Sequence, residues 1–194
     1  MPPKKAAPDF LLVIILLSLL SLGLIMVYSA SAIWADYRFD DSFYFVKRQF
    51  LFALVGIVAM FFIMNIDYWN WRSWAPAILI LCFLLLIAVL IPGIGSVRNG
   101  SRSWIGVGAF SIQPSEFMKL AMIVFLARYL SVNQKKITSF KEGLIPTLTL
   151  VFVAFALIML QPDLGTGTVM VGTCIVMIFI SGARIWHFAV LCLI

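Results

Sequence analysis

The feature that most constrains this chain is its series of long apolar runs, of which the first, Phe10 to Trp34, contains no charged residue. A helix of about 20 apolar residues is long enough to cross the hydrocarbon core of a bilayer. The composition agrees, since 63% of the 194 residues are hydrophobic and only 11% are charged, with a mean hydropathy of +1.10. A soluble domain of this length would carry far more charge. The sequence therefore predicts an integral membrane protein.

The spacing of these runs predicts an all-α fold, a polytopic bundle of transmembrane helices that forms a single integral membrane domain over residues 1–194. Spans are expected near residues 10–34, 47–66, 74–92, 114–131, 143–160 and 164–182. A seventh starts near residue 185 and stops at Ile194, about half the length that a span requires. We therefore expect the sequence to be part of a longer protein.

The distribution of basic residues predicts a cytoplasmic N-terminus. In that orientation eight of the 14 Lys and Arg residues lie on the cytoplasmic side, five lie outside, and Lys119 falls within a span. Short cytoplasmic loops carry the excess of basic residues in membrane proteins. No basic run is typical of a nucleic-acid-binding arm, so nucleic acid is not expected as a partner.

Residues 93–113 hold five glycines interleaved with aromatic and β-branched residues, which suggests an irregular loop on the outer membrane face, packed against protein. Arg98 and Arg102 in this loop are candidates for an anion site, because guanidinium groups bind phosphate in bidentate fashion. Asn99 and Trp104 are added to the candidate substrate-binding residues. The alternative is that both arginines extend to lipid headgroups.

Two similar tetrapeptides open the spans near residues 114 and 164: Gln113-Pro-Ser-Glu116 and Gln161-Pro-Asp-Leu164. Proline suits the first turn of a helix, and a polar or acidic residue follows it in each case. Both helix N-termini would face outward and present partial positive charge and free N–H groups. Gln113, Gln161 and Asp163 are therefore candidate substrate-binding residues. An equally compatible alternative for Asp163 is that it interacts only with the dipole of its own helix.

Glu116 and Lys119 are spaced i,i+3, which places both on one face of an apolar helix. Ionisable residues inside a span usually face the bundle interior or a wet cavity. We predict a cavity-lining pair near the path of a substrate. The alternative is an ion pair that only neutralises itself.

Several of these motifs resemble the signatures of the SEDS family (shape, elongation, division and sporulation), the group of FtsW, RodA and SpoVE. They are Asn99-Gly-Ser-Arg-Ser-Trp104, Ser111-Ile-Gln-Pro-Ser-Glu-Phe-Met-Lys119 and Gln161-Pro-Asp-Leu-Gly-Thr166, with Tyr28-Ser-Ala-Ser31 and Lys47-Arg-Gln49 before them. The resemblance covers essentially the whole chain.

The resemblance implies a protein of about ten spans in the bacterial cytoplasmic membrane. Such a protein polymerises lipid II, an undecaprenyl-pyrophosphate-linked disaccharide pentapeptide, into the glycan strands of cell wall or spore cortex. It works with a class B penicillin-binding protein. The family's catalytic aspartate lies in an outer loop after span 7, so it is expected beyond Ile194. The catalytic residue is therefore unknown, and these 194 residues alone are expected to be inactive.

Three functions are compatible with these residues: a peptidoglycan glycosyltransferase, a transporter that flips lipid II, and a non-catalytic scaffold for a transpeptidase. Buried polar residues and interrupted helix starts suit a transporter as well as an enzyme. The sequence shows no cofactor or metal site, although a divalent cation would be compatible with pyrophosphate chemistry.

Overall fold

The computed structural model describes residues 9–98, 100–107, 110–137, 139–183 and 186. Residue contacts divide the chain into two compact units, Met1–Ile66 and Asp67–Ile194. The predicted seventh span, at residues 185–194, lies outside the described residues except for Trp186. The prediction of a single integral membrane domain stays a prediction.

The first unit is a helical hairpin of α1 (Phe10–Phe39) and α2 (Tyr44–Met64). Asp9 caps α1 by accepting the backbone N–H of Leu11 at 3.0 Å. The helix runs five residues beyond the predicted end at Trp34, because Asp40 first takes up the left-handed conformation that ends it, with φ 55°. In the turn, an ion pair of 2.8 Å joins Lys47 to Asp41.

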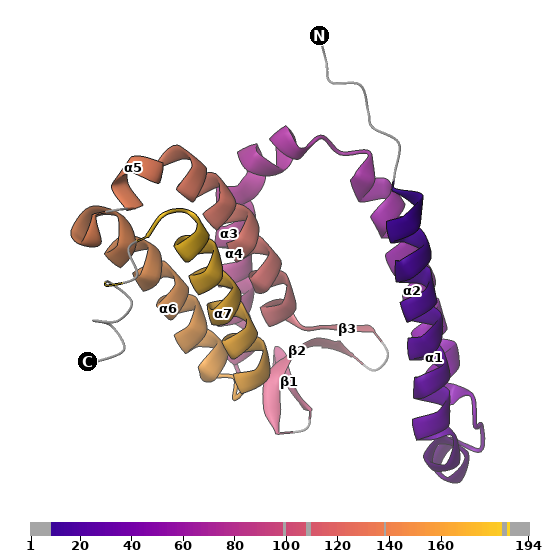
Figure 1. The fold of residues 1–194 in the computed structure, drawn as a ribbon. Helices are drawn as coiled ribbons and strands as arrows, with labels where there is room; N and C mark the ends of the chain where they lie inside the picture. Colours follow the sequence, from indigo (N-terminus) through magenta and orange to yellow (C-terminus); the bar gives the residue numbers. More distant parts are fainter. Residues whose placement is uncertain (1–8, 99, 108–109, 138, 184–185, 187–194) are drawn as a thin grey trace. The chain divides into compact units, whose positions relative to one another are not determined.

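The second unit is a group of four long helices with a small sheet at one end (Figure 1). The helices are α3 (Tyr68–Leu90), α4 (Pro114–Val132), α6 (Ile145–Met159) and α7 (Leu164–Ile180). At the other end, α5 (Gln134–Ile137) and a π-helical turn, Phe140–Leu144, connect α4 to α6. Because α4 contacts α3, α6, α7 and the sheet, it forms the centre of this unit.

The core of the second unit contains apolar residues from all four helices. Those that are completely buried include Leu86 of α3, Met118, Met122 and Leu126 of α4, Val151, Ala154 and Ile158 of α6, and Cys174 and Ile178 of α7. Side chains of this kind pack closely without unsatisfied polar atoms. The core therefore fixes the start of α4 against the start of α7, where the polar candidates lie.

Residues 93–113 do not form the irregular loop that we expected. They form an antiparallel sheet in the order β1 (Gly95–Arg98), β2 (Ser101–Val107) and β3 (Phe110–Ile112). Ile105 is opposite Gly95 on one side and Ile112 on the other. Strand pairing satisfies backbone N–H and C=O groups between neighbouring strands, which favours a sheet where the chain packs against apolar helices.

Gly95 explains how the sheet approaches α3 so closely. A Cβ atom at this position would lie 2.1 Å from the carbonyl oxygen of Val89 and 3.0 Å from Cγ of Arg102. Only glycine lets β1 cross the end of α3 at this distance. The aliphatic part of Arg102 then lies over this glycine.

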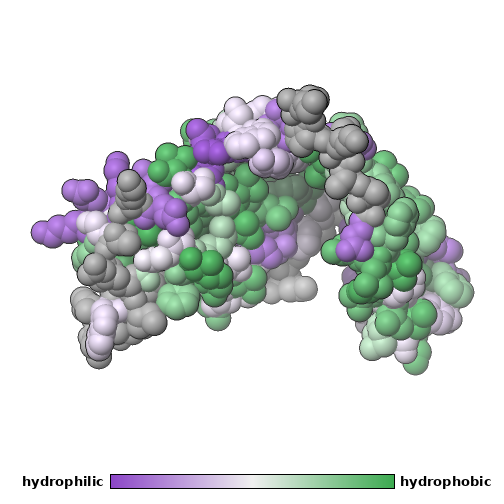
Figure 2. All heavy atoms as spheres, turned by 45° about the horizontal axis from the view of Figure 1, so that its top comes forward, coloured by the Kyte–Doolittle hydropathy of each residue, from purple (hydrophilic) through white to green (hydrophobic). Residues whose placement is uncertain are grey.

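Four helical segments are long and apolar enough to cross a membrane: Phe10–Phe39, Tyr44–Met64, Tyr68–Leu90 and Phe140–Met159. The other two predicted spans also form helices, but α4 carries three charged residues in 19 and α7 has only 17 residues. Hydrophobic side chains cover much of the visible helix surface in Figure 2, and hydrophilic ones gather near the end where α5 lies. Such an apolar exterior suits a lipid environment.

Candidate functional site

The start of α4 agrees with the sequence prediction, whereas the start of α7 differs in one respect. Pro114 is the first residue of α4, and Ser115 after it is fully buried. In the second motif, Asp163 is the N-cap and α7 begins at Leu164. Pro162 therefore precedes the helix and does not lie in its first turn, because the Asp163 side chain takes over the capping position.

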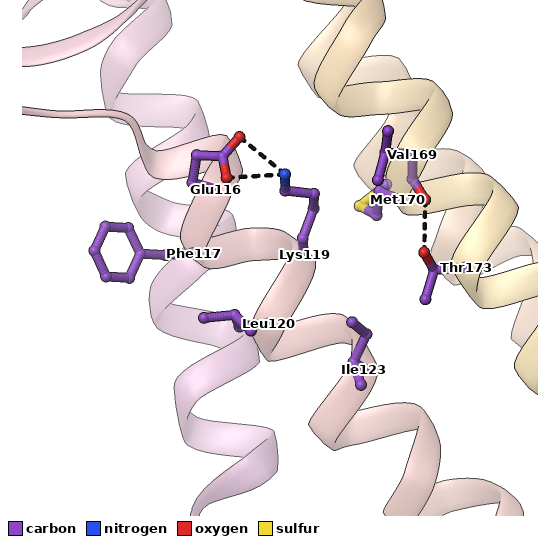
Figure 3. A pocket seen from close by; sticks show the side chains of 8 residues that line it. All are labelled: Glu116, Phe117, Lys119, Leu120, Ile123, Val169, Met170 and Thr173. Atoms are coloured by element: carbon purple, nitrogen blue, oxygen red, sulfur yellow. Dashed lines mark hydrogen bonds and ion pairs between the residues drawn. The ribbon is translucent and has the colours of Figure 1, made fainter. Parts of the chain in front are cut away.

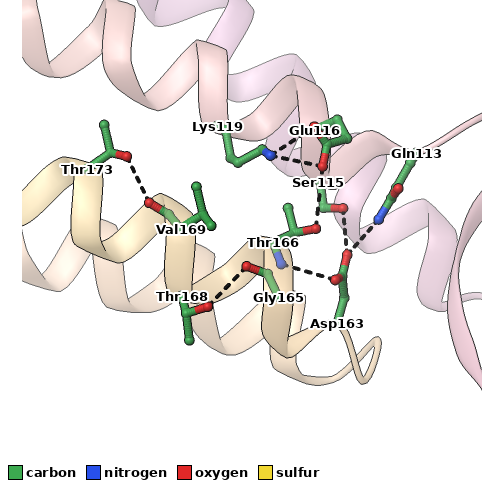
Figure 4. A network of polar contacts seen from close by, with 10 residues as sticks. All are labelled: Gln113, Ser115, Glu116, Lys119, Asp163, Gly165, Thr166, Thr168, Val169 and Thr173. Carbon is green, nitrogen blue, oxygen red and sulfur yellow. Dashed lines mark hydrogen bonds and ion pairs between the residues drawn. The ribbon is translucent and has the colours of Figure 1, made fainter. Parts of the chain in front are cut away.

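Asp163 connects the starts of these two helices (Figure 4). Its Oδ1 accepts the backbone N–H of Thr166 at 3.2 Å, which caps α7. Its Oδ2 accepts Nε2 of Gln113 at 2.7 Å and the hydroxyl of Ser115 at 3.1 Å, both from the start of α4. One carboxylate thus joins segments about 50 residues apart in the sequence.

These contacts also determine the charge of Asp163. Partial burial raises the pKa of the carboxyl, but hydrogen bonds from Thr166, Ser115 and Gln113 outweigh it, so the pKa lies below its ordinary value. A negative carboxylate therefore occupies the N-terminus of α7. The N–H of Thr166 is therefore not free for an anion. Asp163 interacts with its own helix, as in the alternative, but also with the start of α4, and its contact with a substrate stays a prediction.

Glu116 and Lys119 form the predicted ion pair. Nζ of Lys119 lies 2.9 Å from Oε1 and 2.8 Å from Oε2 of Glu116. The Glu116 side chain is 51% exposed and that of Lys119 is 23% exposed. The hydroxyl of Thr166 on α7 also reaches Oε1 of Glu116, at 3.5 Å. The pair therefore belongs to the same α4–α7 contact as Asp163.

A pocket of about 390 Å³ opens between α4 and α7, with this ion pair at one end (Figure 3). Apart from the ion pair and Thr173, its lining is apolar and includes Leu120, Ile123, Val169 and Met170. Glu116 and Lys119 thus line a pocket, and its place on the path of a substrate stays a prediction. An apolar pocket with a charged end has the chemistry to hold a hydrocarbon chain with a polar head.

Gln161 connects the sheet to α3 and is completely buried. Its side-chain Nε2 donates to the backbone carbonyl oxygen of Leu86 at 3.2 Å, and its backbone carbonyl oxygen accepts the hydroxyl of Ser101 at 2.6 Å. Its Oε1 is buried without a partner among the described residues. Burial of this kind gives Gln161 a structural role, and its contact with a substrate stays a prediction.

The remaining candidates lie in the sheet. Arg102 and Trp104 are half-buried residues of β2, and the guanidinium of Arg102 makes no ion pair within the described part of the chain. Ser101, next to Arg102, brings β2 to the turn that precedes α7. Asn99 and the side chain of Arg98 lie outside what the structure describes. Arg102 is thus the described arginine of the predicted anion site.

Sequence reasoning missed Ser115 and Thr166 as members of the site. Ser115 donates to Asp163 and Thr166 to Glu116, across the contact between α4 and α7. The available signal was the similarity of the two helix-opening tetrapeptides, which hinted that the two starts are related. It did not show that they touch.

In the described ranges, no group of three or more His, Cys, Asp or Glu side chains could hold a metal ion.

Comparison with known proteins decides the family. The family model FTSW_RODA_SPOVE, described as a cell cycle protein, matches residues 10–194. The chain belongs to this family. The resemblance to the SEDS group is thereby confirmed.

Two curated relatives show how close this membership is. Stage V sporulation protein E of Bacillus subtilis is 71% identical over 194 residues, which are 100% of this chain and 53% of that protein. A probable peptidoglycan glycosyltransferase FtsW of Trichlorobacter lovleyi is 39% identical over 184 residues, covering 95% of this chain and 48% of the relative. The chain therefore spans about half the length of the curated relatives that it matches.

Solved structures confirm the fold. Rod shape determining protein RodA of Thermus thermophilus matches with a TM-score of 0.75 at 25% identity, covering 99% of this chain and 61% of that one. A chain of a peptidoglycan synthase complex, described as coordinating polymerization and crosslinking, matches with a TM-score of 0.77 at 26% identity; 95% of this chain and 51% of that one are covered. The all-α membrane fold is thus confirmed, and this family member is a multi-pass membrane protein.

Proposed function

We propose that the complete protein is a peptidoglycan glycosyltransferase that polymerises lipid II, and that Arg102 and Lys119 bind the lipid pyrophosphate. Relatives 36–41% identical to this chain are named probable peptidoglycan glycosyltransferases. The observation that carries the proposal is the α4–α7 pocket, which combines an apolar lining with the Glu116–Lys119 ion pair at one end. A polyprenyl chain and its pyrophosphate need these two environments side by side.

Lys119 can contact an anion while it stays paired with Glu116. An ammonium group has three N–H donors, and the two oxygens of Glu116 engage at most two of them. The third donor is available to a phosphate oxygen. Glu116 therefore offsets the cost of placing a cation among apolar helices without using all of its hydrogen-bonding capacity.

In the proposed reaction, a hydroxyl of the acceptor sugar attacks the anomeric carbon of the donor. The C–O bond to the pyrophosphate breaks, and undecaprenyl pyrophosphate leaves with the electron pair. In this proposal a general base outside these 194 residues takes the hydroxyl proton. Arg102 and Lys119 stabilise the negative charge that develops on the leaving group, a task for preorganised cations in a site of low dielectric. A divalent cation stays part of the proposal only as a counter-ion of the pyrophosphate.

The test is polymerisation of purified lipid II by the complete protein. We expect Arg102→Ala to lower kcat about 100-fold, the typical cost of removing one group that stabilises a transition-state charge. The matched control is Arg72→Ala, because Arg72 is an exposed arginine near the opposite end of α3 from the sheet. Wild-type turnover by Arg102→Ala would remove this residue from the mechanism.

A second candidate function is transport of lipid II across the membrane. The polar network between the starts of α4 and α7 is the observation that favours it, since transporters also bind substrates at helix N-termini within the membrane. Flux of labelled lipid II in proteoliposomes under blocked polymerisation would support transport. Lack of flux in the same vesicles would leave the glycosyltransferase.

We further propose that the protein works with a class B penicillin-binding protein in the bacterial cytoplasmic membrane, with the N-terminus inside the cell. The similar chain in a peptidoglycan synthase complex supports a partner of this kind. If the complete protein bound this partner but neither polymerised nor transported lipid II, only the function of a transpeptidase scaffold would be left.

A further inference from the structure

Asp163 makes one more kind of contact than capping requires. An N-cap needs a single side-chain acceptor for a backbone N–H of the first turn, and Oδ1 fills that role with Thr166. Oδ2 instead accepts two donors from the start of α4, Gln113 at 2.7 Å and Ser115 at 3.1 Å. The second oxygen therefore serves the neighbouring helix.

This arrangement leads directly to the ion pair at the pocket. Thr166 donates its N–H to Asp163 and its hydroxyl to Glu116, and Glu116 holds Lys119. The contact from Thr166 to Glu116 measures 3.5 Å, at the upper limit of hydrogen-bond length. A small increase in the separation of the two helix starts would abolish it.

We propose that Asp163 is a positioning residue that clamps the starts of α4 and α7 together, which fixes the Glu116–Lys119 pair at the mouth of the pocket. The inference rests on the proposed function for its catalytic consequence, because Lys119 must meet the pyrophosphate in one orientation. Asp163 itself does not contact the substrate. Hydrogen bonds to an ionised carboxylate are about twice as strong as neutral ones, which suits this residue to joining two helices.

Asp163→Ser separates the clamp from the cap. Serine caps a helix about as well as aspartate, but its single, shorter hydroxyl cannot serve Thr166, Gln113 and Ser115 together. The matched control is Asp67→Ser: Asp67 caps α3 through Trp69 N at 3.2 Å, and no other hydrogen bond to its side chain is found in the described part of the chain.

We expect Asp163→Ser to lower kcat for lipid II polymerisation by the complete protein about 10- to 100-fold, the range that a misplaced catalytic contact costs. Asp67→Ser should stay within about twofold of wild type, as for a surface substitution. Wild-type turnover by Asp163→Ser would overturn the proposal.

A double-mutant cycle with Glu116→Gln tests whether Asp163 acts through the ion pair. If it does, adding Asp163→Ser to Glu116→Gln lowers kcat by less than about twofold further, because interacting residues are not additive. If both full losses multiply, Asp163 only stabilises the fold, and the positioning role is wrong.

A distance measurement distinguishes failure of this inference from failure of the proposed function. Spin labels at Phe117→Cys on α4 and Leu164→Cys on α7, both exposed positions, report the separation of the helix starts in a cysteine-free background. Asp163→Ser should broaden the distance distribution and Asp67→Ser should not. An unchanged distribution overturns the clamp, whatever the activity. If Asp163→Ser broadens the distribution but the complete wild-type protein polymerises no lipid II, the clamp is supported and the proposed function is overturned.

Discussion

Gly167 allows α7 to lie close to α6, and its substitution tests how tightly the second unit is packed. A Cβ atom at Gly167 would lie 2.9 Å from Cε of Met159 and 3.0 Å from a ring carbon of Phe155, both on α6. At Gly172, on the same helix, an added Cβ would meet nothing within 4 Å. Small residues let membrane helices approach one another.

The expected magnitudes follow from these distances. Gly167→Val adds three carbons where the first already lies 2.9 Å from the flexible end of Met159 and 3.0 Å from the Phe155 ring. The end of Met159 can move, so the Phe155 ring is the main obstacle, and overpacking of this kind costs about 1–3 kcal/mol. Valine is a better helix former than glycine by only a few tenths of a kcal/mol, so the net effect stays destabilising. Gly172→Val has the same propensity gain without the clash. The two variants should therefore differ by about 1–3 kcal/mol.

The assay is unfolding of the complete protein in mixed micelles, with SDS as denaturant and helical circular dichroism as the signal. We expect Gly167→Val to unfold at lower SDS than Gly172→Val, and Gly172→Val to stay close to wild type. If Gly167→Val were as stable as Gly172→Val, α6 would not pack closely against α7 at Gly167. The reasoning from the glycine contact would then be refuted.

Two further predictions concern acidity and orientation. Burial raises the pKa of Asp163, but its hydrogen bonds lower the pKa by more, so the folded pKa lies below the ordinary 3.8. The contribution of Asp163 to stability is then fully present above pH 3.8 and is lost as the pH falls through the lower folded value. The free energy of unfolding should fall less steeply in acid for Asp163→Ser than for wild type, and equal slopes would contradict the shift. For orientation, we expect an impermeant maleimide on whole cells to label Val97→Cys in β1 and to label Lys136→Cys in α5 only after lysis, both being exposed positions. Labelling in the reverse order would place the N-terminus outside.

The positions of the helices could be read from the sequence because their signal is local. An uncharged run such as residues 10–34 has no stable alternative to a membrane helix, since every backbone polar group must be satisfied within the segment. The ends differ from the prediction: α1 continues to Phe39 and α3 already begins at Tyr68. These ends depend on caps such as Asp40 and Asp67, whose effect is about the size of a single hydrogen bond.

The sheet at residues 95–112 was missed for a related reason. Its many glycines suggested an irregular loop, but Gly95 is required by the close carbonyl of Val89. A composition rich in glycine does not distinguish a flexible segment from one that passes very near another element. That distinction depends on the position of α3.

By itself, the sequence determined that the chain crosses a membrane and that Glu116 and Lys119 pair on one helix face, because apolar length and i,i+3 spacing are local properties. Only the tertiary structure decided the role of Asp163. Its hydrogen bonds to Gln113 and Ser115 cross about 50 residues of sequence, and they exist because packing of α4 against α7 brings the two helix starts together. A capping carboxylate and an inter-helix clamp have the same local sequence, so the difference is made by the neighbouring helix.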